Sequence, residues 1–503
     1  MLFSELLRSA GLAAVPSGGD PEINDVQFHP RSCGKGSCFV AMRGPTDDGH
    51  RHIPEAAAAG ASAVVCRSID GSAPPGAYVV VEDTRLALGR LAQALRGWPA
   101  RKLKCAAVTG TNGKTTVTYM LRAVLERAGF KPGLLGTVSY QTGQASQPAV
   151  TTTPDPVTLA DLMARMVAAG GTHLVMEASS HALDQQRTAG LDFDAAVYTN
   201  LTGDHLDYHG DMEAYLAAKL RLFEAIGPSS SAVINGDDPY ADRVAEATRA
   251  RVIRYGLDSD AGVPSRQADV RARVSSVDAS GSRFAVLAFG HEVLVSTPVI
   301  GRHNVLNCLA AAGAAIAMGV DLAAVSSALG DLEQVPGRLE RVRARLFGRG
   351  APDGPGVFVD YAHTDDALQN VLLAIRPLAA GRVTLVFGCG GDRDATKRPR
   401  MAAVAERLAD SIVVTSDNPR SEDPQEIIRQ ILSGLGPAGA AKTAVQIDRR
   451  LAIEQAISQA DPADVVLIAG KGHEKYQIIA GRQLPFDDVE VAAGVLLARE
   501  ARR

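Results

Sequence analysis

The 503-residue sequence is poor in cysteine and tryptophan and contains no long apolar run. Its six cysteines are scattered, and the only close pair, Cys33 and Cys38, has no second pair of Cys or His nearby, so we expect reduced thiols rather than disulfides or a zinc site. No uninterrupted apolar stretch reaches about 18 residues, which predicts no membrane-spanning helix. The N-terminal segment carries Glu5 and Arg8 and lacks the basic start of a signal peptide, which predicts an amphipathic helix. Together these absences predict a cytoplasmic protein.

The sequence also lacks an excess of charge of either sign. Fifty-two Lys and Arg residues stand against 56 Asp and Glu residues, a net charge of −4. No polybasic block is present, so we expect no binding of nucleic acid. Hydrophobic residues make up 46% and charged residues 21%, which is typical of a packed globular protein. At roughly 150 residues per domain, the length predicts about three domains.

Apolar strands alternate with helices along the chain, which indicates an α/β protein. Up to residue 100, short strands such as Ala63–Cys66 and the helical run Thr84–Arg96 predict a small α/β domain. Over residues 101–333, apolar strands run into polar or glycine-rich turns, which is typical of a buried parallel sheet, and alternating stretches between Pro264 and Pro298 predict an antiparallel appendage. Over residues 334–503, similar strands end in clusters of polar residues. Because ligands bind beyond the carboxyl ends of parallel strands, we expect a functional crevice there.

The clearest local motif is a glycine-rich turn between a strand and a helix. It reads Gly110, Thr111, Asn112, Gly113, Lys114, Thr115 and Thr116. Glycines let the backbone wind closely around an anion, the helix dipole points at it, Lys114 neutralises it, and Thr115 offers a hydroxyl to Mg²⁺. Two residues separate the glycines, against four in the standard phosphate loop. The loop predicts binding of a nucleoside triphosphate, but by itself it does not separate an ATPase, a kinase, a GTP switch and a ligase.

Further motifs follow in a fixed order. They are Glu177-Ala-Ser-Ser-His181, Asn200-Leu-Thr-Gly-Asp-His205-Leu-Asp-Tyr-His209, His303-Asn304-Val-Leu-Asn307, Pro336-Gly-Arg338, Asp360-Tyr-Ala-His363, Asp417-Asn-Pro-Arg420 and Gly470-Lys-Gly-His-Glu474. With the phosphate loop, this set resembles the Mur ligase family of bacterial cell-wall synthesis, and within it the members that add meso-diaminopimelate. The resemblance covers nearly the whole chain.

The resemblance implies a fold and a reaction. The fold has an N-terminal α/β UDP-substrate-binding domain (residues 1–100), a central P-loop, parallel-sheet ATP-binding domain (101–333) and a C-terminal Rossmann-like amino-acid-binding domain (334–503). The reaction joins meso-diaminopimelate to the D-Glu γ-carboxylate of UDP-MurNAc-L-Ala-D-Glu, with ATP converted to ADP and phosphate. Because a carboxylate is a poor acyl donor, an acyl phosphate would be formed first. We expect a monomer.

The resemblance also assigns residues around the nucleotide. Lys114 would neutralise phosphate, while Thr115, Glu177, His205 and Lys219 would hold Mg²⁺, with Lys219 converted by CO₂ into an anionic carbamate (N6-carboxylysine). The positions matched around ATP, beyond the loop itself, are Asn304, Arg338, Asp360 and His363. Phosphoryl transfer depends on such positioning and charge neutralisation.

Two further sets are implied for the other substrates. The UDP-MurNAc-dipeptide would contact Thr152, Thr153, Ser179, Gln185 and Arg187. Diaminopimelate would contact Arg393, Asp417, Asn418, Pro419, Arg420, Gly470 and Glu474. Diaminopimelate differs from lysine by one carboxylate, which an arginine fork binds well, and in the family Asp-Asn-Pro-Arg marks the diaminopimelate enzymes.

Three alternatives stay open at this point. One is an L-lysine-adding Mur ligase, the second is a ligase similar to folylpolyglutamate synthase, and the third is a nucleotide-binding switch without ligase activity. The chain departs from the family near its N-terminus, where Asp25-Val26-Gln27 replaces Asp-Ser-Arg. The serine that lies near the uracil in the family is therefore absent here.

Overall fold

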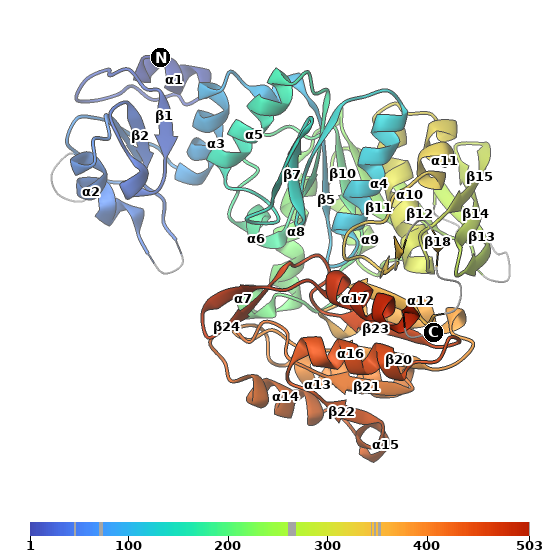
Figure 1. The fold of residues 1–503 in the computed structure, drawn as a ribbon. Coiled ribbons are helices and arrows are strands. Elements are labelled where there is room, and N and C mark those ends of the chain that lie inside the picture. The colour runs from blue at the N-terminus through green and yellow to red at the C-terminus, as the bar shows by residue number, and fades with distance from the viewer. Residues whose placement is uncertain are drawn as a thin grey trace.

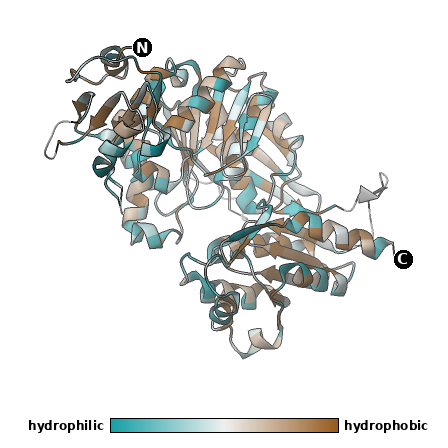
Figure 2. Ribbon diagram, turned by 60° about the vertical axis from the view of Figure 1, so that its left-hand side comes forward, coloured by the Kyte–Doolittle hydropathy of each residue, from teal (hydrophilic) through white to brown (hydrophobic). Residues whose placement is uncertain are grey.

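The computed structural model describes residues 1–44, 47–69, 74–259, 268–343, 345–346, 349–350 and 354–501. Three bodies follow one another along the chain in Figure 1, each built on its own main sheet. The short apolar runs of the sequence form most of the strands, and these are the brown interior of each body in Figure 2. None of the helices in the described part of the chain is long and apolar enough to cross a membrane.

The N-terminal body is a four-stranded parallel sheet, β1-β2-β3-β4, with helices packed on it. Leu6 of the first helix and Leu88 of the third are fully buried against Val65 of the sheet. Its elements are α1 (Phe3–Ser9), β1 (Asp25–Gln27), β2 (Ser37–Val40), α2 (Ile53–Ala58), β3 (Ala63–Cys66), β4 (Ala77–Val80) and α3 (Thr84–Leu95). The predicted amphipathic N-terminal helix is thus present as α1.

The central body is an eleven-stranded sheet in the order β15-β14-β13-β12-β11-β10-β5-β9-β6-β7-β8. Strands β12 to β6 of this order are parallel, as the apolar runs predicted. The strands are β5 (Lys104–Thr109), β6 (Pro132–Leu135), β7 (Ser139–Thr142), β8 (Ala145–Pro148), β9 (His173–Glu177), β10 (Ala195–Tyr198), β11 (Ser231–Asn235), β12 (Arg251–Leu257), β13 (Val270–Asp278), β14 (Gly281–Ala288) and β15 (His291–Thr297).

Two features of this sheet go beyond what the sequence predicted. The expected antiparallel segment is present as β13–β15, but β13 pairs in parallel with β12, so these strands extend the main sheet. The antiparallel edge β6–β8 was not predicted, because β8 is short, polar and exposed.

Helices cover both faces of the central sheet. On one face the alanine-rich helix α10 packs closely with α4, and Gly313 of α10 lies directly against Val233. The helices of this body are α4 (Lys114–Arg127), α5 (Pro156–Ala168), α6 (Ser180–Asp184), α7 (Leu206–His209), α8 (Met212–Ala225), α9 (Ala241–Glu246), α10 (Arg302–Ala317) and α11 (Leu322–Gly330). Because β5 lies inside the sheet, its carboxyl end presents the phosphate loop at the middle of the molecule.

The C-terminal body carries a six-stranded sheet, β16-β19-β23-β20-β21-β22, parallel except for β16. Its strands are β16 (Glu340–Arg341), β19 (Gly356–Asp360), β20 (Val383–Phe387), β21 (Ser411–Val414), β22 (Thr443–Val445) and β23 (Val465–Ala469), with small hairpins β17 (Arg345–Leu346) to β18 (Arg349–Gly350) and β24 (Tyr476–Ile479) to β25 (Arg482–Pro485). Its helices are α12 (Asp365–Ile375), α13 (Lys397–Leu408), α14 (Pro424–Leu432), α15 (Pro437–Ala441), α16 (Arg449–Gln459) and α17 (Asp488–Glu500).

A buried ion pair fixes the end of the central strand in this body. The Arg449 guanidinium donates to both carboxylate oxygens of Asp488, at 2.8 and 2.7 Å, and to the carbonyl of Ala469, the last residue of β23. Both charged side chains are completely buried. A bidentate ion pair with a third hydrogen bond has a well-defined geometry. The pair therefore fixes the point at which the chain leaves β23 and enters the Gly470–Glu474 segment.

Candidate active site

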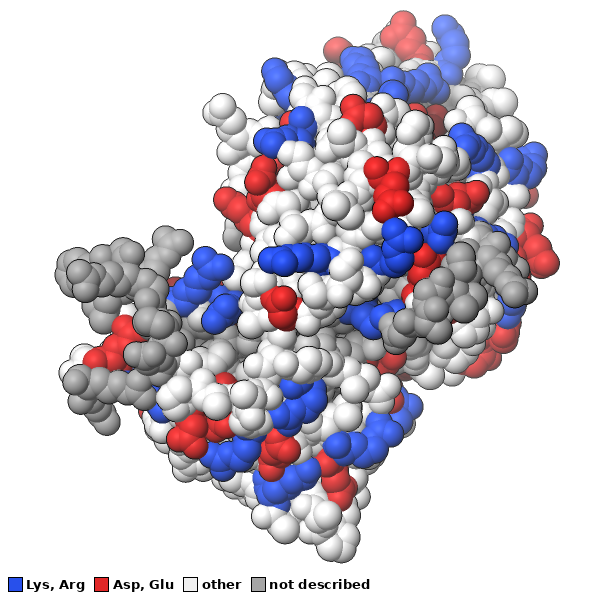
Figure 3. All heavy atoms as spheres, turned by 90° about the vertical axis from the view of Figure 1, so that its right-hand side faces the viewer, with Lys and Arg blue, Asp and Glu red and all other residues white. Residues whose placement is uncertain are grey.

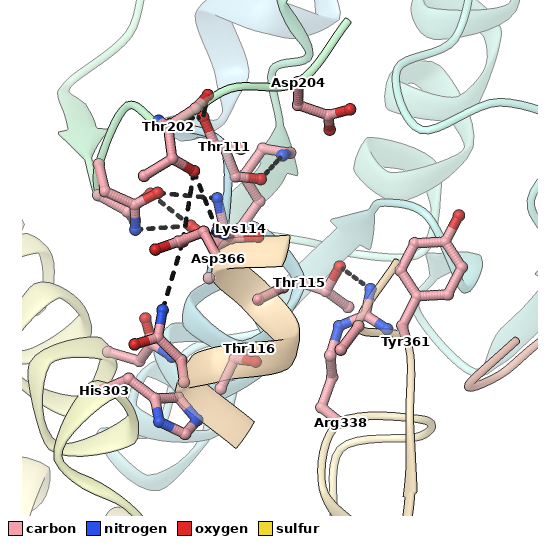
Figure 4. A pocket seen from close by; sticks show the side chains of 18 of the residues that line it. Thr111, Lys114, Thr115, Thr116, Thr202, Asp204, His303, Arg338, Tyr361 and Asp366 are labelled. Carbon is pink, nitrogen blue, oxygen red and sulfur yellow. Dashed lines mark hydrogen bonds between the residues drawn. The ribbon is translucent and has the colours of Figure 1, made fainter. Parts of the chain in front are cut away.

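A cavity of about 390 Å³ lies between the central and C-terminal bodies, over the phosphate loop. Loop residues 111 to 116 line it from one side, and Arg338, Asp360 and His363 line it from the other. Figure 4 shows the labelled side chains converging on this space from several separate elements. The sequence motifs that follow different strands therefore meet at one place, as the crevice at the carboxyl ends of the strands predicted.

The phosphate loop depends on its two glycines. Gly110 has φ 147° and Gly113 has φ 87°, values that side-chain-bearing residues rarely adopt. A Cβ on Gly110 would overlap the Thr199 hydroxyl, and one on Gly113 would lie 2.5 Å from the Asn307 side-chain oxygen. The loop is thus packed against two other segments of the central body.

Two lysines, the half-buried Lys114 and the buried Lys219, share one carbonyl oxygen of this loop. Lys114 Nζ and Lys219 Nζ each donate to the Gly110 carbonyl at 2.9 Å, and Lys114 also donates to the Thr111 carbonyl. Burial lowers the pKa of both amines, and for Lys219 it does so strongly, with the nearby Lys114 charge adding to the effect. Two ammonium charges at one carbonyl repel each other, so the neutral amine is favoured at Lys219.

The predicted Mg²⁺ ligands Thr115, Glu177, His205 and Lys219 all line the cavity. The Glu177 carboxylate accepts from the backbone and hydroxyl of Thr137. Burial lowers the pKa of His205 to about 3, so its imidazole is neutral, the form that binds metal. Within the described residues, no group of three or more His, Cys, Asp and Glu gathers as a ready metal centre. The hydroxyl of Thr115 and the carboxylate of Glu177 are nevertheless the hard oxygen donors that suit Mg²⁺.

Three side chains from the C-terminal body face the loop. The Arg338 guanidinium donates to Thr115 Oγ1 at 2.9 Å and lies 4.7 Å from the centre of the Tyr361 ring. Asp360 accepts from the backbone of Leu339, and so orients the Arg338 segment, while burial raises the pKa of its carboxyl. His363, whose pKa burial lowers to about 4, lies 3.8 Å from Asp204 of the central body.

Asn304 also lies at this cavity. Asn307 donates its amide to Asn304 at 3.0 Å, and Asn304 in turn donates to the carbonyl of Ile300. This pair stands at the start of α10, beside Gly113 of the loop.

The residues expected at the dipeptide form one hydrogen-bonded cluster. Arg187 donates to the Gln185 side chain and to the Thr153 carbonyl, and Thr153 Oγ1 donates to the Glu177 carbonyl at 2.8 Å. Ser179 donates its backbone N–H to Thr153. Thr152 contacts Thr137 at 3.1 Å, which links the cluster to the Glu177 carboxylate.

A second cavity, of about 640 Å³, leads from the N-terminal body to this cluster. Its lining runs from Phe28 and Phe39 past Arg43 and Arg85 to Gln185. The Arg85 guanidinium donates to the carbonyls of Arg43 and Gln185 and so joins the two bodies. Val26, which takes the place of the family's serine, is buried.

The residues expected at diaminopimelate gather around one completely buried lysine. Lys471 Nζ donates to Asn418 and Glu474, at 3.1 and 3.2 Å, and lies 3.7 Å from Asp417. Burial raises the pKa of Glu474. A Cβ on Gly470 would lie 2.5 Å from Asp417, so glycine is required there.

Arg420 lies at the edge of this cluster in a strained conformation. Its φ is 54°, and its backbone N–H donates to the carbonyl of Ile478, so the β24–β25 hairpin holds it. Its guanidinium donates to the Gly391 carbonyl at 2.7 Å, and Pro419 lies against the same glycine. Arg393 also lies near Gly390 and is exposed.

Several residues at the site had no role assigned from the sequence. Lys471, Tyr361 and His473 lie inside motifs that were recognised, but only the structure shows their contacts: the rings of Tyr361 and His473 are 5.1 Å apart, and His473 lies near the backbone of Thr137. Gly337, next to Arg338, lies directly against His473. These contacts connect the phosphate loop, the dipeptide cluster and the Lys471 cluster.

This fold and site define an enzyme of the nucleotide-dependent ligase class. Residues 108–315 match the Mur ligase middle domain, and residues 337–472 match the Mur ligase, glutamate ligase domain. The chain therefore belongs to the Mur ligase family.

Relatives cover the whole chain. The UDP-N-acetylmuramoyl-L-alanyl-D-glutamate--2,6-diaminopimelate ligase of Thermosynechococcus vestitus is 44% identical over 99% of this chain and 98% of its own, and that of Geobacillus kaustophilus is 43% identical over 96% and 97%. A solved structure of a ligase with this name has a TM-score of 0.65 at 33% identity and covers 95% of both chains. Folylpolyglutamate synthase of Mycobacterium tuberculosis, at 20% identity and a TM-score of 0.62, shares the fold over 82% of this chain.

Gly113→Ala is expected to weaken nucleotide binding. Both φ 87° and the contact with Asn307 oppose a side chain there, so we expect the Kd for Mg-ATP, measured by calorimetry, to rise at least about ten-fold. Gly129→Ala is the matched control, because Gly129 has φ 86° but open space around it. Both variants should lose about 1 kcal/mol of stability to backbone strain, and equal Kd values for the two would contradict the role of the Asn307 contact.

Proposed function

We propose that the protein forms an amide between meso-diaminopimelate and the D-Glu γ-carboxylate of UDP-MurNAc-L-Ala-D-Glu, through an acyl phosphate, in peptidoglycan precursor synthesis. The observation that carries the proposal is the contact of Gly337 and Arg338 with both centres. Arg338 reaches Thr115 of the phosphate loop, and Gly337 lies against His473 in the segment that holds Lys471 and Glu474. An activated carboxylate and an incoming amine would therefore meet within one cavity system. The proposal divides the chain into substrate (1–100), ATP (101–333) and amino-acid (334–503) domains.

The chemistry requires two anions, ATP and a carboxylate, to approach each other. Lys114 and Arg338 are two basic side chains that face the phosphate loop, one from each body. Thr115, Glu177 and His205 would hold Mg²⁺, which supplies further neutralisation of phosphate charge when bound. Because Arg338 belongs to the C-terminal body, it can neutralise the transferring group only when that body is closed on the loop.

Lys219 suits the proposed carbamate. A carbamate forms only from a neutral amine, and burial together with Lys114 lowers the pKa of this amine strongly. Conversion to an anion would replace the repulsion of the two ammonium groups at Gly110 by attraction, and would add an oxygen ligand for Mg²⁺.

Arg420 suits the choice of diaminopimelate over lysine. Its guanidinium lies beside Gly390 and Gly391 at the edge of the Lys471 cluster, where it would bind the extra carboxylate. Glu474 and Asp417 supply negative charge for the amino groups. On the central body, the UDP-linked dipeptide substrate would be bound by the cluster of Thr152, Thr153, Ser179, Gln185 and Arg187.

We infer that the protein acts in the cytoplasm, where ATP and nucleotide-linked precursors occur, as a monomer and without nucleic acid. On the face in Figure 3, basic and acidic side chains are interspersed over the central and C-terminal bodies.

The N-terminal body, whose cavity leads to Gln185, argues against a folylpolyglutamate synthase-like activity. Against L-lysine addition stands Arg420, and against a switch stands the Lys471 cluster next to the phosphate loop.

The first test is substrate-dependent release of phosphate. Purified protein with Mg-ATP and UDP-MurNAc-L-Ala-D-Glu should release phosphate and form a tripeptide product, identified by mass spectrometry, when meso-diaminopimelate is added. L-lysine should give little product. A preference for L-lysine would retain the ligase and reject the role of Arg420, and no turnover with either amino acid would reject the proposed reaction.

Arg420→Ala should raise the KM for meso-diaminopimelate by at least about ten-fold, because a charge-assisted bidentate contact is lost. The Kd for UDP-MurNAc-L-Ala-D-Glu should change less than about two-fold, since that substrate lies on the central body. Arg429→Ala is the control, since Arg429 is exposed on α14 and pairs with Glu426 within its own helix. Unchanged amino-acid kinetics in Arg420→Ala would remove this residue from the pocket.

Lys219→Ala should lower kcat by at least about 100-fold, because it removes charge that stabilises the transferring group, and added bicarbonate should not restore activity. With ¹³C-bicarbonate, the unaltered protein should show a carbamate carbon signal by NMR that the variant lacks. Arg221 lies on the same helix α8 but is exposed and paired with Asp184, so Arg221→Ala should keep both the kcat and the carbamate signal. Full activity of Lys219→Ala would exclude a catalytic carbamate.

A further inference from the structure

The first turn of α12 reaches from the C-terminal body to two loops of the central body. Asp366 Oδ2 accepts from the Asn112 side-chain amide at 2.8 Å and from the Thr202 hydroxyl at 3.3 Å. Asn370, one turn further along α12, donates to the same oxygen at 3.3 Å. Figure 4 shows Asp366 near Thr202 among the side chains that line the cavity. One carboxylate oxygen thus connects the phosphate loop, the loop after β10 and the C-terminal body.

The local structure directs this carboxylate across the boundary. Thr364 caps α12 by accepting from the backbone N–H of Ala367, which places Asp366 in the first helical turn, where the helix dipole favours a negative charge. The neighbouring Asp365 faces its own body instead, 3.5 Å from Arg400. The two adjacent aspartates therefore have the same chemistry and different partners.

Asn112 is a sensitive point of the phosphate loop, because it lies between the two glycines. Its backbone N–H donates to the Asn200 side chain, its carbonyl accepts from Thr199, and its side-chain amide donates to Asp366. The first two contacts come from the same body as the loop. Only the third depends on the position of the C-terminal body, and it is the shorter of two contacts of this amide, which also donates to the Thr202 hydroxyl of the central body at 3.5 Å.

We propose that Asp366 is a positioning residue that couples closure of the C-terminal body to the geometry of the phosphate loop. With the bodies closed, Asp366 holds Asn112 and Thr202 together and the loop is set for the nucleotide. With the bodies apart, Asn112 loses this partner and the loop relaxes. ATP would then be committed to transfer only when the body that carries the amino-acid site is docked. The inference rests on the proposed function only in requiring that ATP is the bound nucleotide.

The test is a double-mutant cycle between Asp366 and Asn112 in the full-length protein. Asp366→Ala should raise the Kd for Mg-ATP about ten-fold, the size expected for hydrogen bonds to a charged group. Asp366→Asn, whose amide oxygen can still accept from Asn112, should retain most of the affinity. In the Asn112→Ala background, Asp366→Ala should raise the Kd by less than about two-fold more, because the shared contact is already lost. Asp365→Ala is the matched control and should bind Mg-ATP as the unaltered protein does.

A second readout separates positioning from a merely structural role. Small-angle scattering with saturating ADP should give a larger radius of gyration for Asp366→Ala than for Asp365→Ala, at equal Tm. If Asp366→Ala lowers Tm, the affinity of Asp366→Asn for Mg-ATP and the double-mutant cycle decide whether Asp366 positions the loop. Equal behaviour of the two alanine variants, or losses from Asp366 and Asn112 that simply multiply, would overturn the coupling.

The same measurements distinguish this inference from the proposed function. Nucleotide affinity and scattering need neither amino acid nor UDP-linked substrate. Coupling without diaminopimelate-dependent turnover would retain the role of Asp366 and reject the proposed reaction. Turnover without coupling would retain the proposed reaction and reject the role of Asp366.

Discussion

The carbonyl oxygen of Gly110 is the point on which the site is organised, because two lysines, one of them completely buried, donate to it. Lys114 belongs to the phosphate loop itself, whereas Lys219 comes from α8. Positive charge gathered in this way, away from water, is favourable only if anions complete it. ATP phosphates are the anions that such a loop binds, and a carbamate on Lys219 would be another. The buried cations thus determine both what the site binds and why one of the lysines gives up its proton.

The C-terminal body supplies what the loop lacks. Arg338 contributes a further cation through Thr115, and Asp366 contributes the acceptor for Asn112. Both contacts are hydrogen bonds that cross from the C-terminal body to the phosphate loop. Within the C-terminal body, the buried Arg449–Asp488 pair and the Lys471 cluster fix the chain on either side of Gly470, so the segment proposed to bind the amino acid is firmly held.

Much of this protein could be predicted from local sequence. The parallel strands of the central and C-terminal sheets follow from short apolar runs ending in polar turns, and the phosphate loop follows from its glycines and Lys114. The antiparallel edge β6–β8 could not be predicted from the sequence, because β8 is polar and exposed and has no apolar pattern. The pairing of β13–β15 with the main sheet could not be predicted either, because alternation along a strand indicates which face is buried and not which strand it pairs with.

The sequence by itself determined the class of fold, the nucleotide loop and the order of the motifs, because these depend on residue types at short, fixed spacing. Only the tertiary structure shows which groups surround Lys219, Asp366 and Lys471. A lysine on a helix, an aspartate in a first helical turn and a lysine between glycines are ordinary surface features in sequence. In the structure they contact partners distant in the chain, Gly110, Asn112 and Asn418 respectively, and a charge acquires its chemical consequence only from the groups and the solvent that surround it.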